Sequence, residues 1–139
     1  KRDLIDDEGY RRDVYLCPAG KRTIGIGHNI EARPLPAGWV PPLTDEQIHQ
    51  LFLEDIDGAD LAARKSFDSF DDWTENRQAA VVNLIFNMGE PVFRQFHVTR
   101  AALRNGQWSA AAAGLRNSKW YRQVQESRSS RILRQIENG

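Results

Sequence analysis

The stretch EGYRRDVYLCPAGKRTIGIGH, residues 8–28, decides how this chain folds. Its first residue, Glu8, closes an expected short helix. Two strand-like runs follow, at residues 10–16 and 22–27. The sequence Cys-Pro-Ala-Gly between them favours a reversal, because proline fixes its own φ and glycine can adopt a positive φ. The stretch therefore predicts a β-hairpin that folds back toward a helix end.

This hairpin gathers three side chains with useful chemistry. The reversal brings Cys17 and Thr23 toward Glu8, so that a thiol, a hydroxyl and a carboxyl meet at the mouth of one cleft. A carboxylic acid can protonate a leaving oxygen while a second polar group directs water. The constellation therefore suits water-assisted cleavage of an acetal bond.

The next part of the chain predicts a loop and a long helix. Residues 29–43 are rich in proline and glycine, which indicates an irregular surface loop. The sequence Thr-Asp-Glu-Gln at residues 44–47 is a capping box, with Thr44 as the N-cap and Gln47 at the third helical position. Apolar residues then recur at helical spacing, so we expect a helix that runs to about residue 65.

The sequence after residue 65 predicts helices and no strands. Residues 75–88 are apolar on all sides, which is typical of a central core helix. We expect one helical segment over residues 92–105 and a short helix over residues 107–116. Ser127 is expected to cap the last helix, which has apolar residues on one side and arginines on the other.

Together these elements predict an α+β fold with two lobes. We expect a single domain: a small N-terminal lobe with a β-hairpin or three-stranded sheet (residues 9–43), a long linking helix (44–65) and an all-helical C-terminal lobe (66–139). The helix over residues 2–8 is expected to pack on the C-terminal lobe. A cleft between the lobes is the expected place for a ligand.

Composition narrows the class of protein. The chain has 139 residues, of which 40% are hydrophobic, enough for a packed core and too many for a disordered chain. These residues contain no signal peptide and no apolar run long enough to cross a bilayer. The sequence begins at Lys1 rather than Met, so an export or anchor segment could precede it. Cys17 is the only cysteine, which excludes an internal disulfide and cysteine-rich zinc patterns.

Charge is unevenly distributed along a chain whose net charge is zero. Residues 31–76 have a balance of −8, whereas residues 90–139 have a balance of +6. A basic C-terminal half suggests an anionic partner. Both bacterial cell wall and nucleic acid fit that description.

The spacing of Glu8, Cys17 and Thr23 resembles that in the active-site segment of the phage-type lysozymes, which are endolysins of the glycoside hydrolase family twenty-four type. That motif is a Glu, eight residues, an Asp or Cys, five residues, a Thr and a TIGIGH-like strand. Here eight residues separate Glu8 from Cys17, and five separate Cys17 from Thr23. The segments LFLEDID, NLIFNMGE and SKWY further along also look like family signatures. The resemblance covers nearly the full chain and implies the two-lobed lysozyme-like fold.

The resemblance assigns roles to the three residues. Glu8 would be the general acid, held protonated by burial, and the Thr23 hydroxyl would hold the attacking water. Cys17 stands where many relatives have Asp. A thiolate there would either orient water, which inverts the anomer, or attack the anomeric carbon, which retains it. The family is inverting, which favours the first route.

Further residues are implied by the resemblance alone. It assigns a structural pair to His28 and Asp55. It assigns saccharide binding to five residues of the helical half, namely Phe86, Asn87, Phe96, Thr99 and Arg128. It implies no metal and no cofactor.

The leading interpretation is a muramidase that hydrolyses the β-1,4 bond between N-acetylmuramic acid and N-acetylglucosamine in bacterial peptidoglycan and causes host cell lysis. We expect a monomer that is made in the host cytoplasm, acts on peptidoglycan in the periplasm or cell wall, and binds no nucleic acid. One alternative is a catalytically weak wall-binding protein in which Cys17 marks lost activity. Another is a helical nucleic-acid binder, although the chain shows no helix-turn-helix or finger signature.

Overall fold

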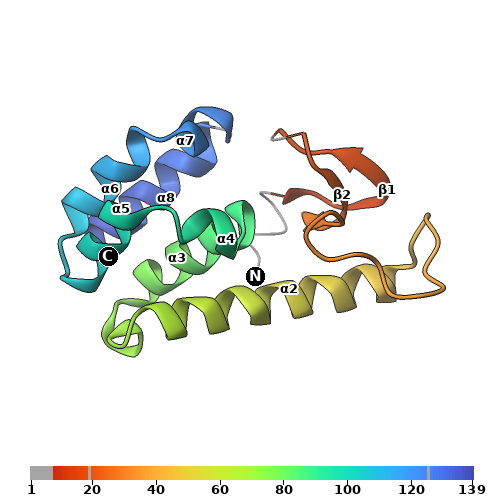
Figure 1. Cartoon of the computed structure of the whole chain (residues 1–139), viewed down its shortest axis with the longest axis horizontal. Helices are drawn as coiled ribbons and strands as arrows, with labels where there is room; N and C mark the ends of the chain where they lie inside the picture. The colour runs from red at the N-terminus through yellow and green to blue at the C-terminus, as the bar shows by residue number, and fades with distance from the viewer. Residues whose placement is uncertain (1–7, 19, 125) are drawn as a thin grey trace. The chain divides into compact units, whose positions relative to one another are not determined.

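The structure is a computed structural model that describes residues 8–18, 20–124 and 126–139. Three strands lie between residues 11 and 29, and the helices that follow them begin at residue 45 (Figure 1). The chain divides into two compact units, Lys1–Asp57 and Gly58–Gly139. The boundary lies within the long helix, not at one of its ends. Apart from Glu8, which is helical, the expected helix over residues 2–8 lies outside the described residues.

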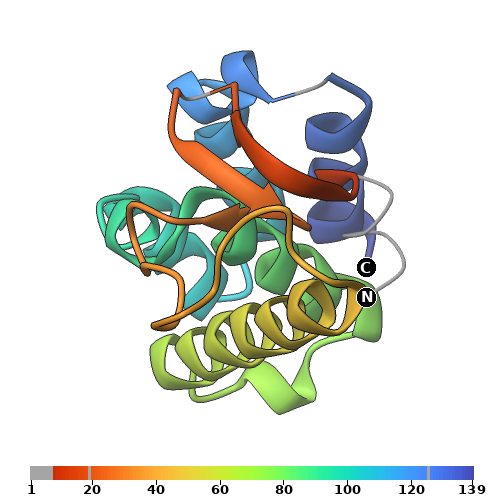
Figure 2. The same cartoon turned by 90° about the vertical axis from the view of Figure 1, so that its right-hand side faces the viewer.

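The first unit contains a three-stranded antiparallel sheet, whose first two strands are the red and orange arrows in Figure 2. Its strands pair in sequence order and are β1 (Arg11–Leu16), β2 (Arg22–Gly25) and β3 (His28–Asn29). The three-stranded form of the prediction is therefore confirmed. The run expected at residues 22–27 is shorter, because Gly25 and Gly27 have φ values of +66° and +69°. These left-handed conformations turn the chain between β2 and β3.

The long helix, α2 (Asp45–Ser66), begins with the predicted capping box. The backbone N–H of Gln47 donates to Thr44 Oγ1 at 3.1 Å, and the backbone N–H of Thr44 donates to Gln47 Oε1 at 3.0 Å. Arg12 of β1 joins the sheet to this helix start, since its guanidinium donates to Asp45 Oδ1 at 2.5 Å and its carbonyl accepts from Leu43 N at 2.9 Å. The helix start and the first strand are thus held together within one unit.

The first unit has its own buried apolar residues. They come from β2, the turn after it, the end of the loop and the first turns of α2, and are Ile24, Ile26, Leu43, Ile48, Leu51 and Phe52. The loop between β3 and α2 has no regular structure, as its proline content predicts. None of the helices among the described residues is both long and apolar enough to cross a membrane.

The second unit is helical. After α2 come η1 (Phe70–Asp72), α3 (Glu75–Met88), α4 (Glu90–Phe93), α5 (His97–Arg104), α6 (Trp108–Arg116), α7 (Lys119–Gln123) and α8 (Glu126–Asn138). Helix α8 packs on α3 and α6, and α6 also packs on α5. The core between them includes Val81, Leu84, Phe93, Leu115 and Ile132.

Three expectations for the helical half need correction. The single segment over residues 92–105 is two helices, because the chain makes tight turns through Gln95 and Phe96, where Phe96 N donates to Phe93 O at 3.1 Å and His97 N to Gln95 O at 2.9 Å. Ser127 does not cap the last helix, since α8 already begins at Glu126. Helix α3 is not apolar all round, because it also buries Asn83.

Candidate active site

Glu8 directs its carboxyl group at the turn between β2 and β3. A Cβ atom added at Gly27 would lie 2.7 Å from both Cδ and Oε2 of Glu8 and 2.8 Å from its Cγ. These separations are far below an ordinary contact between heavy atoms. The Glu8 carboxyl therefore occupies the space that a side chain at position 27 would need. Glu8 itself is partly buried.

Cys17 and Thr23 meet around one carbonyl group at the turn between β1 and β2. The carbonyl oxygen of Lys21 accepts from Cys17 N at 3.0 Å and from Thr23 Oγ1 at 2.9 Å. Thr23 is only 3% exposed, whereas Cys17 is partly exposed and its thiol is free. Because the hydroxyl hydrogen of Thr23 points at Lys21, the Thr23 oxygen keeps lone pairs that can accept from a water.

The three residues are therefore arranged around β2. Thr23 is the second residue of β2, Cys17 directly follows β1, and the Glu8 carboxyl lies against the turn after β2. A strand rises about 3.3 Å per residue, so the four residues of β2 separate its ends by roughly 10 Å. The structure joins Cys17 and Thr23 through the Lys21 carbonyl and places the Glu8 carboxyl against Gly27.

His28 ties the sheet to α2. Its Nδ1 lies 2.8 Å from Asp55 Oδ2, its Nε2 lies 2.8 Å from the carbonyl oxygen of Arg33, and it is 2% exposed. The Arg33 guanidinium donates to Asp55 at 2.8 Å and to Glu54 at 2.9 Å. Partial burial opposes the charge on Arg33, but its bonds to the two carboxylates outweigh that effect and raise the pKa of Arg33. These contacts fix the strand that follows the Gly27 turn.

The five residues expected to bind saccharide all lie in the second unit. Phe86 and Phe96 are partly buried and pack against the helical core. Asn87 Oδ1 accepts from the indole Nε1 of Trp120 at 2.6 Å. Thr99 is 2% exposed, and a Cβ atom at Gly114 would lie 2.5 Å from its hydroxyl oxygen. The absent side chain at position 114 thus leaves room for the Thr99 hydroxyl.

Arg128 is the fifth of these residues, and it is a buried cation. It is 4% exposed, and its Nε and Nη2 donate to Asn83 Oδ1 at 3.3 and 2.6 Å. Asn83 is itself buried on α3. A buried arginine is normally held by such hydrogen bonds, and here they join α8 to α3. Arg128 is therefore not the solvent-exposed arginine that is usual on a helix surface.

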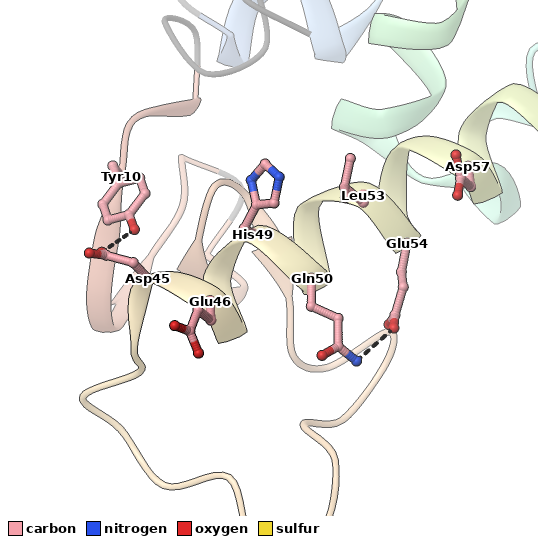
Figure 3. Close-up of a pocket in the computed structure, with 8 residues that line it drawn as sticks. All are labelled: Tyr10, Asp45, Glu46, His49, Gln50, Leu53, Glu54 and Asp57. Carbon is pink, nitrogen blue, oxygen red and sulfur yellow. Dashed lines mark hydrogen bonds between the residues drawn. The ribbon is translucent and has the colours of Figure 1, made fainter.

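A hollow of about 620 Å³ lies along α2 in the first unit (Figure 3). Its described lining residues are Tyr10, Asp45, Glu46, His49, Gln50, Leu53, Glu54 and Asp57, and they include none of the three candidate catalytic residues. Figure 3 shows that His49, Leu53 and Asp57 leave one side of the helix, whereas Glu46, Gln50 and Glu54 leave the other. Because these side chains diverge, the hollow is a poor candidate for the reaction site.

A metal centre finds no support in the part of the chain that the structure describes. Within it, no group of three or more His, Cys, Asp or Glu residues could hold a metal ion.

The small antiparallel sheet followed by helices, with a glutamate directed at the glycine-rich turn, defines an α+β protein of the lysozyme-like class. Comparison with known proteins agrees. The chain matches the phage lysozyme family over residues 6–136. It is also 33% identical over 105 residues to an endolysin of Acyrthosiphon pisum secondary endosymbiont phage 1, a match that covers 76% of this chain and 66% of that endolysin. The chain belongs to the phage lysozyme family.

The structure adds residues that the sequence did not single out. Gly27 belongs to the quoted TIGIGH segment, and the alternating glycines were a visible signal of an unusual backbone there. Arg33 lies in the proline-rich loop, and Asn83 lies in an apolar helix. Neither of these had a local sequence signal, because each acquires its role only through a partner distant in the sequence.

Proposed function

We propose that this chain is a muramidase, which hydrolyses the β-1,4 glycosidic bond between N-acetylmuramic acid and N-acetylglucosamine in bacterial peptidoglycan and so lyses the host cell. Membership of the phage lysozyme family supports this activity. The observation that carries the proposal is the Glu8 carboxyl set against the glycine-rich turn of the TIGIGH segment. Proton delivery to a leaving oxygen requires a carboxyl group in a defined position, and the absence of a side chain at Gly27 leaves room for the Glu8 carboxyl there.

In the proposed reaction Glu8 donates its proton to the glycosidic oxygen as the bond from that oxygen to C1 breaks. A water molecule that donates a hydrogen bond to Thr23 Oγ1 attacks C1 from the opposite face. One proton of this water passes to the Cys17 thiolate. The product then has the inverted anomer. Inverting glycosidases keep their two groups about 6.5–9.5 Å apart to admit a water, whereas retaining ones keep them about 5–5.5 Å apart. The proposed inversion therefore requires the Cys17 thiol and the Glu8 carboxyl to lie at the wider separation.

The test is the release of reducing ends from purified peptidoglycan. Glu8→Gln keeps the shape of the side chain but removes the acid, and we expect activity to fall by about 10²–10⁴-fold. The matched control is Glu46→Gln, which changes an exposed glutamate at the start of α2 and should leave activity within about twofold. Full activity in Glu8→Gln would contradict the proposed role of Glu8.

The same assay distinguishes the muramidase from the alternative function, a catalytically weak wall-binding protein. A wild-type protein that sediments with peptidoglycan but releases no reducing ends would be a wall-binding relative in which Cys17 replaces an essential group. Cys17→Asp would then be expected to restore activity, because a carboxylate can hold and polarise the attacking water. Salt-sensitive binding to DNA would instead favour the nucleic-acid reading.

We infer peptidoglycan as the partner and the periplasm or cell wall as the place of action. Residues 90–139 have a charge balance of +6, which favours an anionic polymer such as the cell wall. We also infer a monomer, which sedimentation equilibrium would check against a mass of 15.9 kDa.

A further inference from the structure

The turn between β2 and β3 has a glycine at each end, and the two glycines differ in what surrounds them. Gly25 and Gly27 both have positive φ. A Cβ atom at Gly25 would lie 3.3 Å from a methyl carbon of Ile48, a buried core residue. A Cβ atom at Gly27 would instead meet three atoms of the Glu8 side chain, at 2.7 to 2.8 Å. The space over Gly27 is therefore filled by a carboxyl group and not by the core.

We propose that Gly27 is a positioning residue for the Glu8 carboxyl. Because glycine has no side chain, the carboxyl of the proposed general acid can occupy the space over position 27. This inference rests on the proposed function of Glu8, but the geometry behind it is independent of activity. Position 27 therefore requires a residue that has no side chain, in addition to one that can adopt a positive φ. A residue that merely tolerates positive φ would satisfy the turn and still displace the acid.

The size of the displacement follows from contact distances. Heavy atoms of carbon in contact are normally about 3.5–4.0 Å apart, so a Cβ at position 27 would push the carboxyl away by about 1 Å. The Glu8 carboxyl is the far end of a flexible side chain, so it can move while the strands stay in place. A misplacement of about 1 Å in a reacting group can cost 10²-fold in rate. Loss of activity with little loss of structure is the expected signature.

Two substitutions at Gly27 distinguish the steric effect of an added side chain from the strain of a positive φ. Gly27→Ala adds a Cβ and strains the positive φ, because alanine rarely adopts that conformation. Gly27→Asn adds a Cβ with much less strain, because asparagine visits the left-handed region several times more often than other residues with a Cβ. If Gly27 serves only the backbone, Gly27→Asn will keep its activity. If Gly27 makes room for Glu8, both variants will lose it.

Gly38 provides the matched control. It belongs to the same unit, has a φ of +85°, and would meet nothing within 4 Å if a Cβ were added. Gly38→Ala and Gly38→Asn therefore reproduce the backbone effect without the contact. On soluble peptidoglycan fragments we expect kcat to fall about 10- to 100-fold in both Gly27 variants, with KM within about twofold, and to stay within about twofold in both Gly38 variants.

A second readout observes the carboxyl directly. In protein labelled with ¹³C at the glutamate δ-carbon, the Glu8 resonance is identified by its loss in Glu8→Gln. We expect this resonance to shift in Gly27→Ala and Gly27→Asn and to stay in place in the Gly38 variants. Gly27→Asn decides the question if Gly27→Ala does not fold.

The two readouts also separate this inference from the proposed function. An inactive wild type would remove the muramidase proposal, yet the δ-carbon resonance would still report whether position 27 places the Glu8 carboxyl. Wild-type kcat in Gly27→Asn, or an unmoved Glu8 resonance in both Gly27 variants, would overturn the positioning role.

Discussion

His28 shows how one side chain can fix the strand that follows the Gly27 turn. Both of its ring nitrogens contact oxygen atoms at 2.8 Å, one from Asp55 on α2 and one from the backbone of Arg33. Its burial at 2% exposure means that water cannot easily replace either contact. The pairing with Asp55 was expected from the family resemblance, whereas the contribution of Arg33 was not.

We therefore predict that His28→Ala destabilises the protein without touching the proposed catalytic groups. The change removes the imidazole contacts to two oxygen atoms and opens a cavity, so the free energy of unfolding should fall by about 2–4 kcal/mol. Urea unfolding measures it. His97→Ala, at an exposed position of α5, is the control and should stay within about 0.5 kcal/mol of wild type. Equal effects of the two changes would show that the His28 contacts do not stabilise the fold.

Asp45 gives a prediction for pH dependence. A hydrogen bond from the Tyr10 hydroxyl, with the nearby charge of Arg12, lowers the pKa of Asp45 in the folded protein. A lowered pKa stabilises the folded state above the unfolded pKa of about 3.9, and this contribution is lost as pH falls through the folded value. In Asp45→Asn the free energy of unfolding should therefore fall less steeply below about pH 4.

Chemical unfolding at a series of acid pH values tests this. Asp68→Asn is the control, because Asp68 is exposed and has no ion pair among the described residues. An acid limb that is equally steep in wild type and Asp45→Asn would show that the Tyr10 and Arg12 contacts are not maintained in solution.

At the scale of elements, Arg77 joins three helices of the second unit. Its guanidinium donates to the carbonyl oxygens of Ile136 and Glu137 at 2.8 and 2.9 Å, and so binds the C-terminal end of α8 from α3. It also lies over the Trp108 ring of α6, 4.3 Å from the ring centre. A planar guanidinium can serve both contacts at once, which an ammonium group cannot do in the same geometry.

Arg77→Lys should therefore destabilise the second unit although the charge is kept. We expect a loss of about 1–2 kcal/mol and faster amide exchange in the last turn of α8. Arg134→Lys, at an exposed position of α8, is the matched control and should change little. Unchanged exchange in the last turn of α8 in Arg77→Lys would contradict the role of Arg77 as a clamp.

Elements with a strong local signal were predictable from sequence. The capping box of α2 has both expected hydrogen bonds, and α3 has the expected bounds, Glu75–Met88. The break between α4 and α5 was missed, because the sequence there has neither glycine nor proline and Phe96 offers no side-chain cap. Helix α7 was missed as well, although Ser118 caps it by accepting from Tyr121 N at 3.2 Å.

The candidate site was predictable only in part, for a physical reason. Spacing alone nominated Glu8, Cys17 and Thr23, and the structure joins the last two through the carbonyl of Lys21. The contact of Glu8 with Gly27 depends on how the β2–β3 turn closes, which spacing does not reveal. The catalytic roles of all three residues stay predictions.

At the scale of the whole molecule, the chain combines two compact units, and the proposed roles differ between them. The first holds the sheet and the three candidate catalytic residues, and the second holds the helical core and the five residues proposed to bind saccharide. The family match extends across both units, over residues 6–136.

The central claim is that Glu8 protonates the leaving oxygen while Cys17 and Thr23 direct a water. The configuration of the first product tests it most directly, by proton NMR of the new reducing end before it mutarotates. Water attack on the β-linked sugar predicts that the α-anomer appears first. A β-anomer as the first product would contradict this account, because it would mean that a covalent intermediate forms, with Cys17 as the nucleophile.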